Sequence, residues 1–332
     1  MKILQIIPGL EQGGAEIHLI NLANELFKRG HEIIIAHSGG SLEKNLCDGI
    51  KIIHLPVDRK NLFTGLYSAF KLENLKIDLI HVHSRVPAWI AWIIASRKKI
   101  KWLMTAHAMY SLNAGIIPLK HADGIICVSE AVKNHLAGRI SDLNTVIPNG
   151  IKIPDKKNTQ PENNIFLSVG RLTRLKCIDI TLKALAQLKN YEWQYNIIGD
   201  GAQLNELKNL ADELKIFDRV KFHGAQNKNY VENLMLNSSC LLFPSNSEGM
   251  PLTMLEAMSV NLPVIASDIE GVQQFSKSGA NLIEPENISK WKTAIENFIL
   301  NRISSDLDSK NIISIERMTD LTEEFYKKVL AK

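Results

Sequence analysis

The chain reads IFLSVGRLTRLK from Ile165 to Lys176, half-way along its 332 residues. The run from Ile165 to Gly170 predicts a buried strand that ends at a glycine, and a basic loop follows it. Similar short apolar runs alternate with helix-length segments on both sides of this stretch. Such alternation predicts βαβ units, and therefore parallel sheets with helices on both faces.

The alternation is interrupted once, which divides the chain into two doubly wound α/β domains. Residues 153–164 are polar, hold two prolines and lack an apolar period, so we expect a linker there. We predict one domain over residues 1–152, a second over residues 165–304, and a terminal helical segment, residues 305–332, that packs back on the first. The predicted strands are Ile3–Ile7, Ile33–Ala36, Ile50–Val57, Leu79–His83, Trp102–Ala106, Gly124–Val128, Ile165–Gly170, Tyr195–Ile198, Val220–Phe222, Cys240–Pro244 and Pro263–Ala266.

Composition excludes several classes of protein. A net charge of +4 without a dense basic stripe argues against a dedicated nucleic-acid binder. The four cysteines lack the spacing of a zinc site, so we expect free thiols in a reducing cytoplasm. No segment has the apolar length of a membrane span or the pattern of a signal peptide. We therefore expect a cytoplasmic protein.

Two glycine-containing loops follow predicted strands. Gly13 and Gly14 open a helix predicted from Ala15 to Arg29, where backbone amides favour a phosphate, although a tight strand-to-helix turn has the same pattern. In the loop after Gly170, Arg171 and Lys176 have the charge to neutralise a diphosphate. A solvated basic loop is the alternative there.

A third motif reads EGMPLTMLEAM from Glu248 to Met258. Pro251 is expected at the first helical position, so that the next amides face a phosphate. Glu248 would then lie in the loop and Glu256 about 1.5 turns inside the helix, from where their carboxylates reach different hydroxyls of one ligand. The alternative is a helix cap followed by a surface glutamate.

Taken in order, these motifs resemble those of the family 4 retaining glycosyltransferases. Glu248 and Glu256 resemble the paired glutamates of that family, and further matching segments lie at residues 13–16, 128–130, 146–151, 170–179, 198–201, 222–224 and 263–267. The resemblance implies the GT-B fold, in which two Rossmann-like domains face each other across a cleft. Four positions depart from the family pattern: Cys177 and Asn261 replace glycines, Gln274 replaces a glutamate, and residues 279–282 lack a second glycine.

The resemblance also implies roles. Arg171 and Lys176 would hold the donor diphosphate, Glu256 the ribose, and Glu248 the donor sugar, which His107 would contact from the first domain. No cofactor and no metal are expected, and a UDP-sugar is the favoured donor. The implied catalytic residues are His107, Glu248, Arg171 and Lys176. The implied donor-binding residues are Gly13, Gly14, Gly170, Arg171, Lys176, Glu248, Gly249, Met250, Leu252, Thr253 and Glu256.

The acceptor is expected on the first domain. His83, Ser84 and Arg85 end a predicted strand there and resemble bacterial enzymes that extend lipopolysaccharide or lipid-linked glycans. Basic residues beside tryptophans suit an anionic membrane surface, and peripheral binding there is one interpretation. A solvated helix end with core tryptophans is the other. The residues concerned are Trp89, Trp92, Trp102, Arg97, Lys98, Lys99 and Lys101.

We therefore predict a hexosyltransferase that moves a sugar from a nucleotide-diphosphate sugar to a hydroxyl of a glycan or lipid-linked acceptor, in bacterial surface polysaccharide synthesis. Because the sequence offers no second carboxylate as nucleophile, a same-face mechanism is favoured over a covalent intermediate. Two alternatives stay open. One is a sugar-nucleotide epimerase of similar build, and the other is a degenerate protein that only binds sugar nucleotides.

Overall fold

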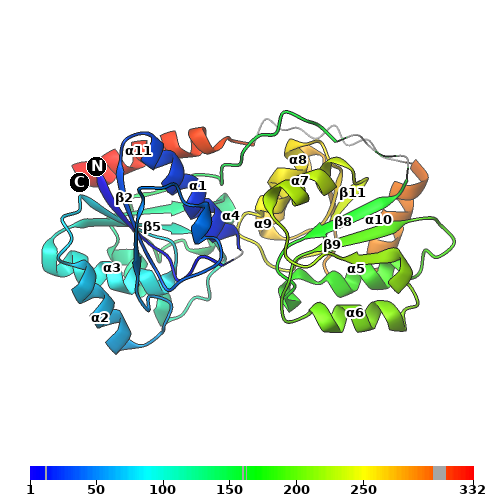
Figure 1. The fold of residues 1–332 in the computed structure, drawn as a ribbon, viewed down its shortest axis with the longest axis horizontal. Helices are drawn as coiled ribbons and strands as arrows, with labels where there is room; N and C mark the ends of the chain where they lie inside the picture. Colours follow the sequence, from blue (N-terminus) through cyan, green and yellow to red (C-terminus); the bar gives the residue numbers. More distant parts are fainter. Residues whose placement is uncertain (12, 159–160, 162, 302–311) are drawn as a thin grey trace. The chain divides into compact units, whose positions relative to one another are not determined.

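A computed structural model describes residues 1–11, 13–158, 161, 163–301 and 312–332. The chain divides into two compact units (Figure 1): unit 1 holds residues 1–150 and 313–332, and unit 2 holds residues 151–312. The division therefore falls at Gly150, before the predicted linker. Linker residues 159, 160 and 162, and residues 302–311 at the predicted junction with the terminal segment, lie outside the described residues. In the described part of the chain, no helix has the length and apolarity needed to cross a membrane.

Unit 1 is built on a parallel sheet with the strand order β3-β2-β1-β4-β5-β6-β7. The short last strand, β7, was not predicted, because its residues Asn144 and Thr145 are polar and half-buried. The strands are β1 (Lys2–Ile6), β2 (Glu32–His37), β3 (Lys51–His54), β4 (Leu79–Val82), β5 (Lys101–Ala106), β6 (Gly124–Cys127) and β7 (Asn144–Val146).

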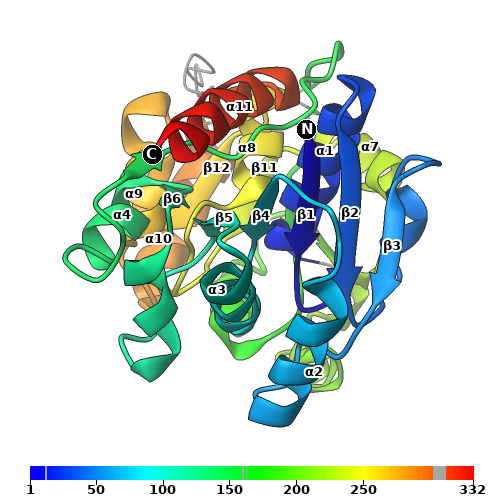
Figure 2. The ribbon, with the colours of Figure 1, turned by 90° about the vertical axis from the view of Figure 1, so that its left-hand side faces the viewer.

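Helices cover both faces of this sheet. Helices α1 (Gly14–Lys28) and α11 (Ile315–Ala331) lie on one face, and α2 (Leu62–Leu72) and α3 (Arg85–Lys98) on the other, as Figure 2 shows. The short helix α4 (Glu130–His135) follows β6. Alternate strand residues such as Ile3, Ile33 and Leu103 form the core beneath α1 and α11.

The C-terminal helix α11 is fixed to unit 1 by polar contacts. The hydroxyl of Tyr326 lies 2.7 Å from Nδ1 of the buried His81. One guanidinium nitrogen of Arg29 bonds both Asp320 (2.7 Å) and Glu323 (2.6 Å). Because one cation serves two carboxylates of α11, these contacts hold the helix against the end of α1.

Unit 2 is a second parallel sheet, with the strand order β10-β9-β8-β11-β12-β13. The predicted α/β class, with two parallel sheets and alternating helices, is confirmed. Strand β13 was not predicted. The strands are β8 (Ile165–Val169), β9 (Gln194–Ile198), β10 (Val220–Phe222), β11 (Cys240–Phe243), β12 (Val264–Ser267) and β13 (Asn281–Ile283). The helices are α5 (Ile178–Leu185), α6 (Leu204–Glu213), α7 (Lys228–Leu236), α8 (Leu252–Ser259), α9 (Glu270–Gln273) and α10 (Ile288–Asn301).

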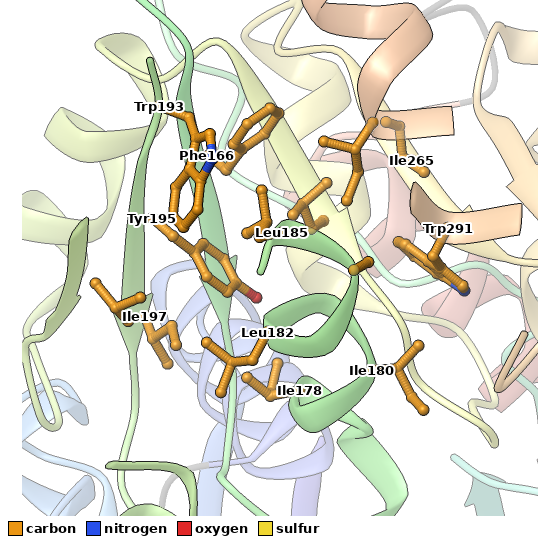
Figure 3. Packing of buried hydrophobic residues seen from close by; sticks show 14 of the residues in the cluster. Phe166, Ile178, Ile180, Leu182, Leu185, Trp193, Tyr195, Ile197, Ile265 and Trp291 are labelled. Carbon is orange, nitrogen blue, oxygen red and sulfur yellow. The ribbon is translucent and has the colours of Figure 1, made fainter. Parts of the chain in front are cut away.

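Aromatic residues form the core of unit 2. Figure 3 shows α5 between Phe166 and Tyr195, which come from the sheet, and Trp291 of α10. All three aromatic side chains are fully buried, and the Tyr195 hydroxyl bonds Ser168 (2.7 Å) and Thr181 (2.8 Å). This packing fixes the start of α5, and with it the loop that carries Lys176.

Two of the departures from the family pattern fall in a backbone conformation that favours glycine. Cys177 has a φ of 49° and Asn261 a φ of 61°. Asparagine visits this left-handed region at modest cost, whereas cysteine carries the ordinary side-chain penalty. Both turns therefore adopt a left-handed conformation at a residue other than glycine, which adopts it most easily.

Candidate functional site

The loop after β8 is held by main-chain contacts to the loop after β9. The amide of Gly170 donates to Ile198 O (3.0 Å), and the amide of Leu172 donates to Asp200 O (2.8 Å). Gly199 has a φ of +137°, and a Cβ there would lie 1.8 Å from Gly170 O. Only glycine fits this position, so the two loops are built as one rigid unit at the carboxyl edge of the sheet.

Lys176 and Glu248 meet at this edge. Lys176 Nζ lies 2.6 Å from Glu248 Oε1 and 5.1 Å from the centre of the Phe243 ring. The Lys176 side chain is 24% exposed and the Glu248 side chain 15%. The Glu248 main chain packs closely against Gly271, since a Cβ on Gly271 would lie 2.1 Å from Glu248 O. The sequence singled out both charged residues, but not their direct pairing.

A small pocket lies beside this pair, at the ends of β8, β9 and β11. Gly170 and Lys176 are the predicted donor residues that line it. Their neighbours in the lining are mostly apolar, which lowers the local dielectric around the ammonium group. The full lining comprises Ser168, Val169, Gly170, Leu172, Lys176, Ile178, Ile198, Leu242, Phe243, Pro244 and Ser245.

Helix α8 begins one residue later than predicted. Pro251 is the residue before the helix, not its first residue, and its carbonyl accepts from Met254 (3.2 Å) and Leu255 (3.3 Å). Leu252 and Thr253 therefore supply the first-turn amides, which a helix leaves without an internal partner. Gly249, Met250 and Leu252 are buried or nearly so, and Thr253 is half-buried.

Glu256 lies one turn inside α8. Burial raises the pKa of its carboxyl group, and the neighbouring charges act in opposite directions, with Lys228 lowering the pKa and Glu232 raising it. A half-buried acid of this kind suits a site where its carboxylate accepts from neutral hydroxyls. Arg171, by contrast, is exposed.

His107 of unit 1 lies in a cluster of histidines. Its Nε2 is 3.2 Å from Nδ1 of His83, whose Nε2 is 3.2 Å from Gln5 Oε1. The ring of His18 packs edge-on against His107 at 4.7 Å, and its Nδ1 is 2.9 Å from Asn149 Oδ1. The side-chain oxygens of Gln5 and Asn149 can only accept, so Nε2 of His83 and Nδ1 of His18 carry the protons. Nδ1 of His83 then accepts a hydrogen bond from Nε2 of His107. His18 Nε2 then keeps a lone pair, and it meets no hydrogen-bond partner among the described residues.

The whole cluster is held neutral. Burial lowers the pKa of His18 to about 4, although its bond to Asn149 acts the other way. Burial also lowers the pKa of His83 and of His107, and the neighbouring histidines reinforce both shifts. Neutral imidazoles both donate and accept, which suits contacts with sugar hydroxyls.

Among the residues that the structure describes, two groups of side chains have ligand atoms close enough to hold a metal ion. They are His18, His83 and His107, and also His37, Glu43 and His54. In the first group, an ion would have to replace the His83–His107 hydrogen bond. In the second, His37 Nδ1 accepts from the Gly39 amide at 3.0 Å. The proton of neutral His37 is then on Nε2, the atom that faces Glu43, so that nitrogen is not a ready ligand. We assign no metal to either group.

The three acceptor-side residues have different surroundings. His83 is 1% exposed and both ring nitrogens are engaged, so its contact with a ligand would act through His107. Ser84 and Arg85 are half-buried, and α3 begins at Arg85. The Arg85 guanidinium lies 5.1 Å from the centre of the Tyr110 ring.

The tryptophans do not form an exposed face. Trp102 is 1% exposed, and Trp92 stacks on His121 with ring centres 4.5 Å apart. Trp89 is 36% exposed. Trp102 is therefore a core residue, as the second interpretation has it, whereas Trp92 is half-buried against His121 and Trp89 stays exposed.

Sequence reasoning missed Gln5, His18 and Asn149 as parts of the histidine cluster. His18 had a signal, since it falls on the apolar face of the helix that follows the glycine loop. Asn149 belongs to the 146–151 segment that resembles the family, and its bond to His18 gives that segment a structural purpose. Gln5 lies within an apolar strand and gave no signal.

Comparison with known proteins identifies the family. The family model Glycosyl transferases group 1 matches residues 151–314, and Glycosyltransferase Family 4 matches residues 12–153. The chain is a family 4, group 1 glycosyltransferase. An uncharacterized glycosyltransferase of Haemophilus influenzae is 28% identical to this glycosyltransferase over 311 residues, covering 87% of each chain.

Two further proteins resemble this glycosyltransferase along most of its length. One is a component of the human phosphatidylinositol N-acetylglucosaminyltransferase, which is 24% identical, with 96% of this chain and 73% of the human one covered. The Anabaena HepE protein, solved in complex with UDP-glucose, superimposes with a TM-score of 0.85 at 18% identity, covering 99% of this chain and 100% of HepE. The fold is therefore GT-B.

Proposed function

We propose that this glycosyltransferase takes its sugar from a nucleotide-diphosphate donor, with a UDP-sugar as the first candidate, and transfers it with retention of configuration. The observation that carries the proposal is the contact of Lys176 with Glu248 at the carboxyl edge of the unit 2 sheet. An ammonium group binds a diphosphate, and a carboxylate beside it accepts from sugar hydroxyls. The complex of HepE with UDP-glucose supports a donor of this class.

The other donor residues are assigned around that contact. Arg171 adds a second cation for the diphosphate, and the first-turn amides of α8 add main-chain donors. Glu256 accepts from the ribose hydroxyls, for which its half-buried carboxylate is suited. His107 binds the donor sugar from unit 1 as a neutral hydrogen-bond partner.

The proposed reaction proceeds on one face of the sugar. The anomeric carbon loses its bond to the diphosphate oxygen and forms one to the acceptor oxygen, and the acceptor's proton passes to the departing phosphate. Lys176, Arg171 and the α8 amides stabilise the charge that develops on the leaving group. We propose that these groups suffice without a divalent metal.

The proposed acceptor is a hydroxyl of a lipid-linked glycan, bound on the unit 1 side near Ser84 and Arg85. Two observations favour a lipid-linked acceptor. The human relative is named for phosphatidylinositol, and residues 81–89 resemble enzymes of lipopolysaccharide and lipid-linked glycan synthesis. A role in bacterial surface polysaccharide synthesis, at the cytoplasmic face of the membrane, follows from this assignment.

The test is a thermal-shift panel of UDP-, GDP- and ADP-sugars, since binding raises the melting temperature with ligand concentration. We expect a UDP-sugar to give the largest shift and Lys176→Ala or Arg171→Ala to reduce it. Lys189→Ala, an exposed unit 2 lysine, serves as the control and should leave it unchanged. If both charge variants bind as tightly as the parent, the diphosphate assignment is wrong.

Turnover separates the remaining alternatives. Slow hydrolysis of the UDP-sugar, undiminished in excess EDTA, is expected for a metal-independent transferase. An epimerase would interconvert two UDP-sugars without an acceptor, and a pure binding protein would do neither. Loss of turnover in EDTA that magnesium restores would contradict the metal-free mechanism.

A further inference from the structure

Helix α2 of unit 1 turns its large apolar side chains outward. The exposed fractions are 71% for Leu62, 81% for Phe63, 43% for Leu66, 51% for Tyr67 and 56% for Phe70. At 3.6 residues per turn, these five positions fall within an arc of about 140° on one side of the helix. They form a continuous apolar stripe, which we call the α2 stripe.

The opposite side of α2 carries small residues and packs on α3. Ser68 and Ala69 are buried, together with Leu72, and Gly65 is half-buried beside them. A surface helix ordinarily buries its large apolar residues and exposes its polar ones. Here the aromatic residues are the exposed ones, and an exposed apolar surface of this kind marks a site of association.

Basic residues surround the α2 stripe. Arg59 and Lys60 precede the helix, and Lys71 and Lys76 lie at its end, all four exposed. The acids here are the exposed Asp58, the buried Glu73, and the exposed Asp78, which accepts from the Lys2 amide at 2.7 Å.

The end of α3 adds to this positive charge. Arg97 Nε lies 3.1 Å from Glu73 Oε2, so the last turn of α3 meets the end of α2. That ion pair cancels the charge of Glu73 and brings the exposed Lys98 and Lys99 beside the helix. The surroundings of the α2 stripe are therefore net positive, with six exposed basic residues against two exposed acids.

We propose that the α2 stripe inserts into an anionic lipid surface, with the surrounding lysines and arginines contacting the headgroups. Aromatic and leucine side chains on one face of a helix, flanked by basic residues, are what interfacial binding requires. A second copy of this chain is a poorer occupant, because a two-fold contact would place the same basic residues opposite each other. The inference rests on the proposed lipid-linked acceptor, whose glycan such docking would bring to unit 1.

The experiment measures binding of the whole chain to vesicles of phosphatidylcholine, with and without phosphatidylglycerol, by flotation. We expect binding to the anionic vesicles that weakens as salt rises. The double variant Phe63→Ser/Phe70→Ser should lower the partition coefficient at least about tenfold. Its matched control is Phe217→Ser/Leu300→Ser, which removes two unit 2 side chains that are 48% and 61% exposed. That control should bind vesicles like the parent.

A second pair of variants tests the charges. Arg59→Gln/Lys60→Gln should weaken binding to anionic vesicles and reduce its salt dependence, whereas Lys189→Gln/Lys221→Gln on unit 2 should not. Equal binding of the Phe63/Phe70 variant and the parent would overturn the proposal. A parent that dimerises through these residues in solution and ignores vesicles would overturn it too.

Affinity for UDP is measured on every variant and should match the parent, because none of the substituted residues belongs to the proposed donor site. This separates the two proposals. Loss of vesicle binding with normal UDP affinity concerns α2 alone. A parent that binds vesicles but no nucleotide sugar refutes the proposed function and leaves the lipid docking standing.

Discussion

Lys176 Nζ and Glu248 Oε1 lie 2.6 Å apart, so each side chain neutralises the other at the proposed donor site. An arriving diphosphate must therefore compete with Glu248 for the same ammonium group. The pairing also holds the lysine side chain in place before the donor binds, which reduces the ordering cost of binding.

The first prediction follows from this competition. Glu248→Gln removes the competing charge, so the affinity for free UDP should rise about two- to fivefold, the equivalent of an ion pair worth roughly 0.5–1 kcal/mol. The same variant should lower kcat at least about tenfold, because the contact with the sugar is lost where charge develops. Calorimetry and steady-state kinetics measure both effects, with Glu213→Gln on α6 as a control. Weaker UDP binding with normal kcat would reverse the assigned role.

Glu256 should behave differently. Its raised pKa means that ionising the carboxyl group costs more in the folded protein than in the unfolded chain. Stability from this group is present below the unfolded pKa and is lost as pH rises through the folded pKa. Glu256→Gln should therefore melt higher than the parent near pH 7, and this advantage should shrink toward pH 4. The donor KM should rise more than kcat falls, since ribose binding is similar in the ground and transition states. A variant that melts lower than the parent at pH 7 would contradict the burial argument.

The histidine cluster predicts the opposite pH trend. Because the pKa of His18 falls to about 4 from 6.5, the unfolded chain binds a proton first as the pH drops. This group alone should cost about 3 kcal/mol of stability between pH 6.5 and 4. His18→Gln should reduce the slope of the free energy of unfolding against pH in that window. The same slope in parent and His18→Gln would show that His18 does not stay neutral in the fold.

The positions of most strands could be predicted from the sequence, because each buried strand is a short apolar run. Strands β7 (Asn144–Val146) and β13 (Asn281–Ile283) were not predicted, because each has three residues and none of these is fully buried. The strand order could not be predicted. It depends on contacts between segments far apart in the chain, for which a single sequence holds no signal.

The site residues illustrate the same limit. Lys176 and Glu248 could be chosen by residue type and loop position, but their contact depends on β8 and β11 being neighbours. His18 and Asn149 are 131 residues apart, and only the folded sheet brings them together. Trp102 could be read as a core or a surface residue, and the choice depends on the helices that cover its strand β5, which a single sequence does not reveal.

The last prediction concerns Cys177, whose φ of 49° lies in the left-handed region. A non-glycine residue there costs roughly 1–2 kcal/mol, and Cys177→Ala would keep this cost while losing the thiol, which bonds Arg174 O at 3.2 Å. Cys177→Gly also loses the thiol but relieves the backbone. We therefore expect the glycine variant to be more stable than the alanine variant by about 1 kcal/mol, the reverse of the usual order.

Cys240 supplies the matched comparison, because it lies buried in the extended strand β11. There the alanine variant should be the more stable one, since glycine gains nothing in an extended strand and costs entropy. Urea unfolding of the four variants measures both differences. UDP affinity should be the same for both Cys177 variants, because the turn that presents Lys176 keeps its backbone conformation. If Cys177→Ala equals or exceeds Cys177→Gly in stability, the left-handed turn before α5 carries no strain.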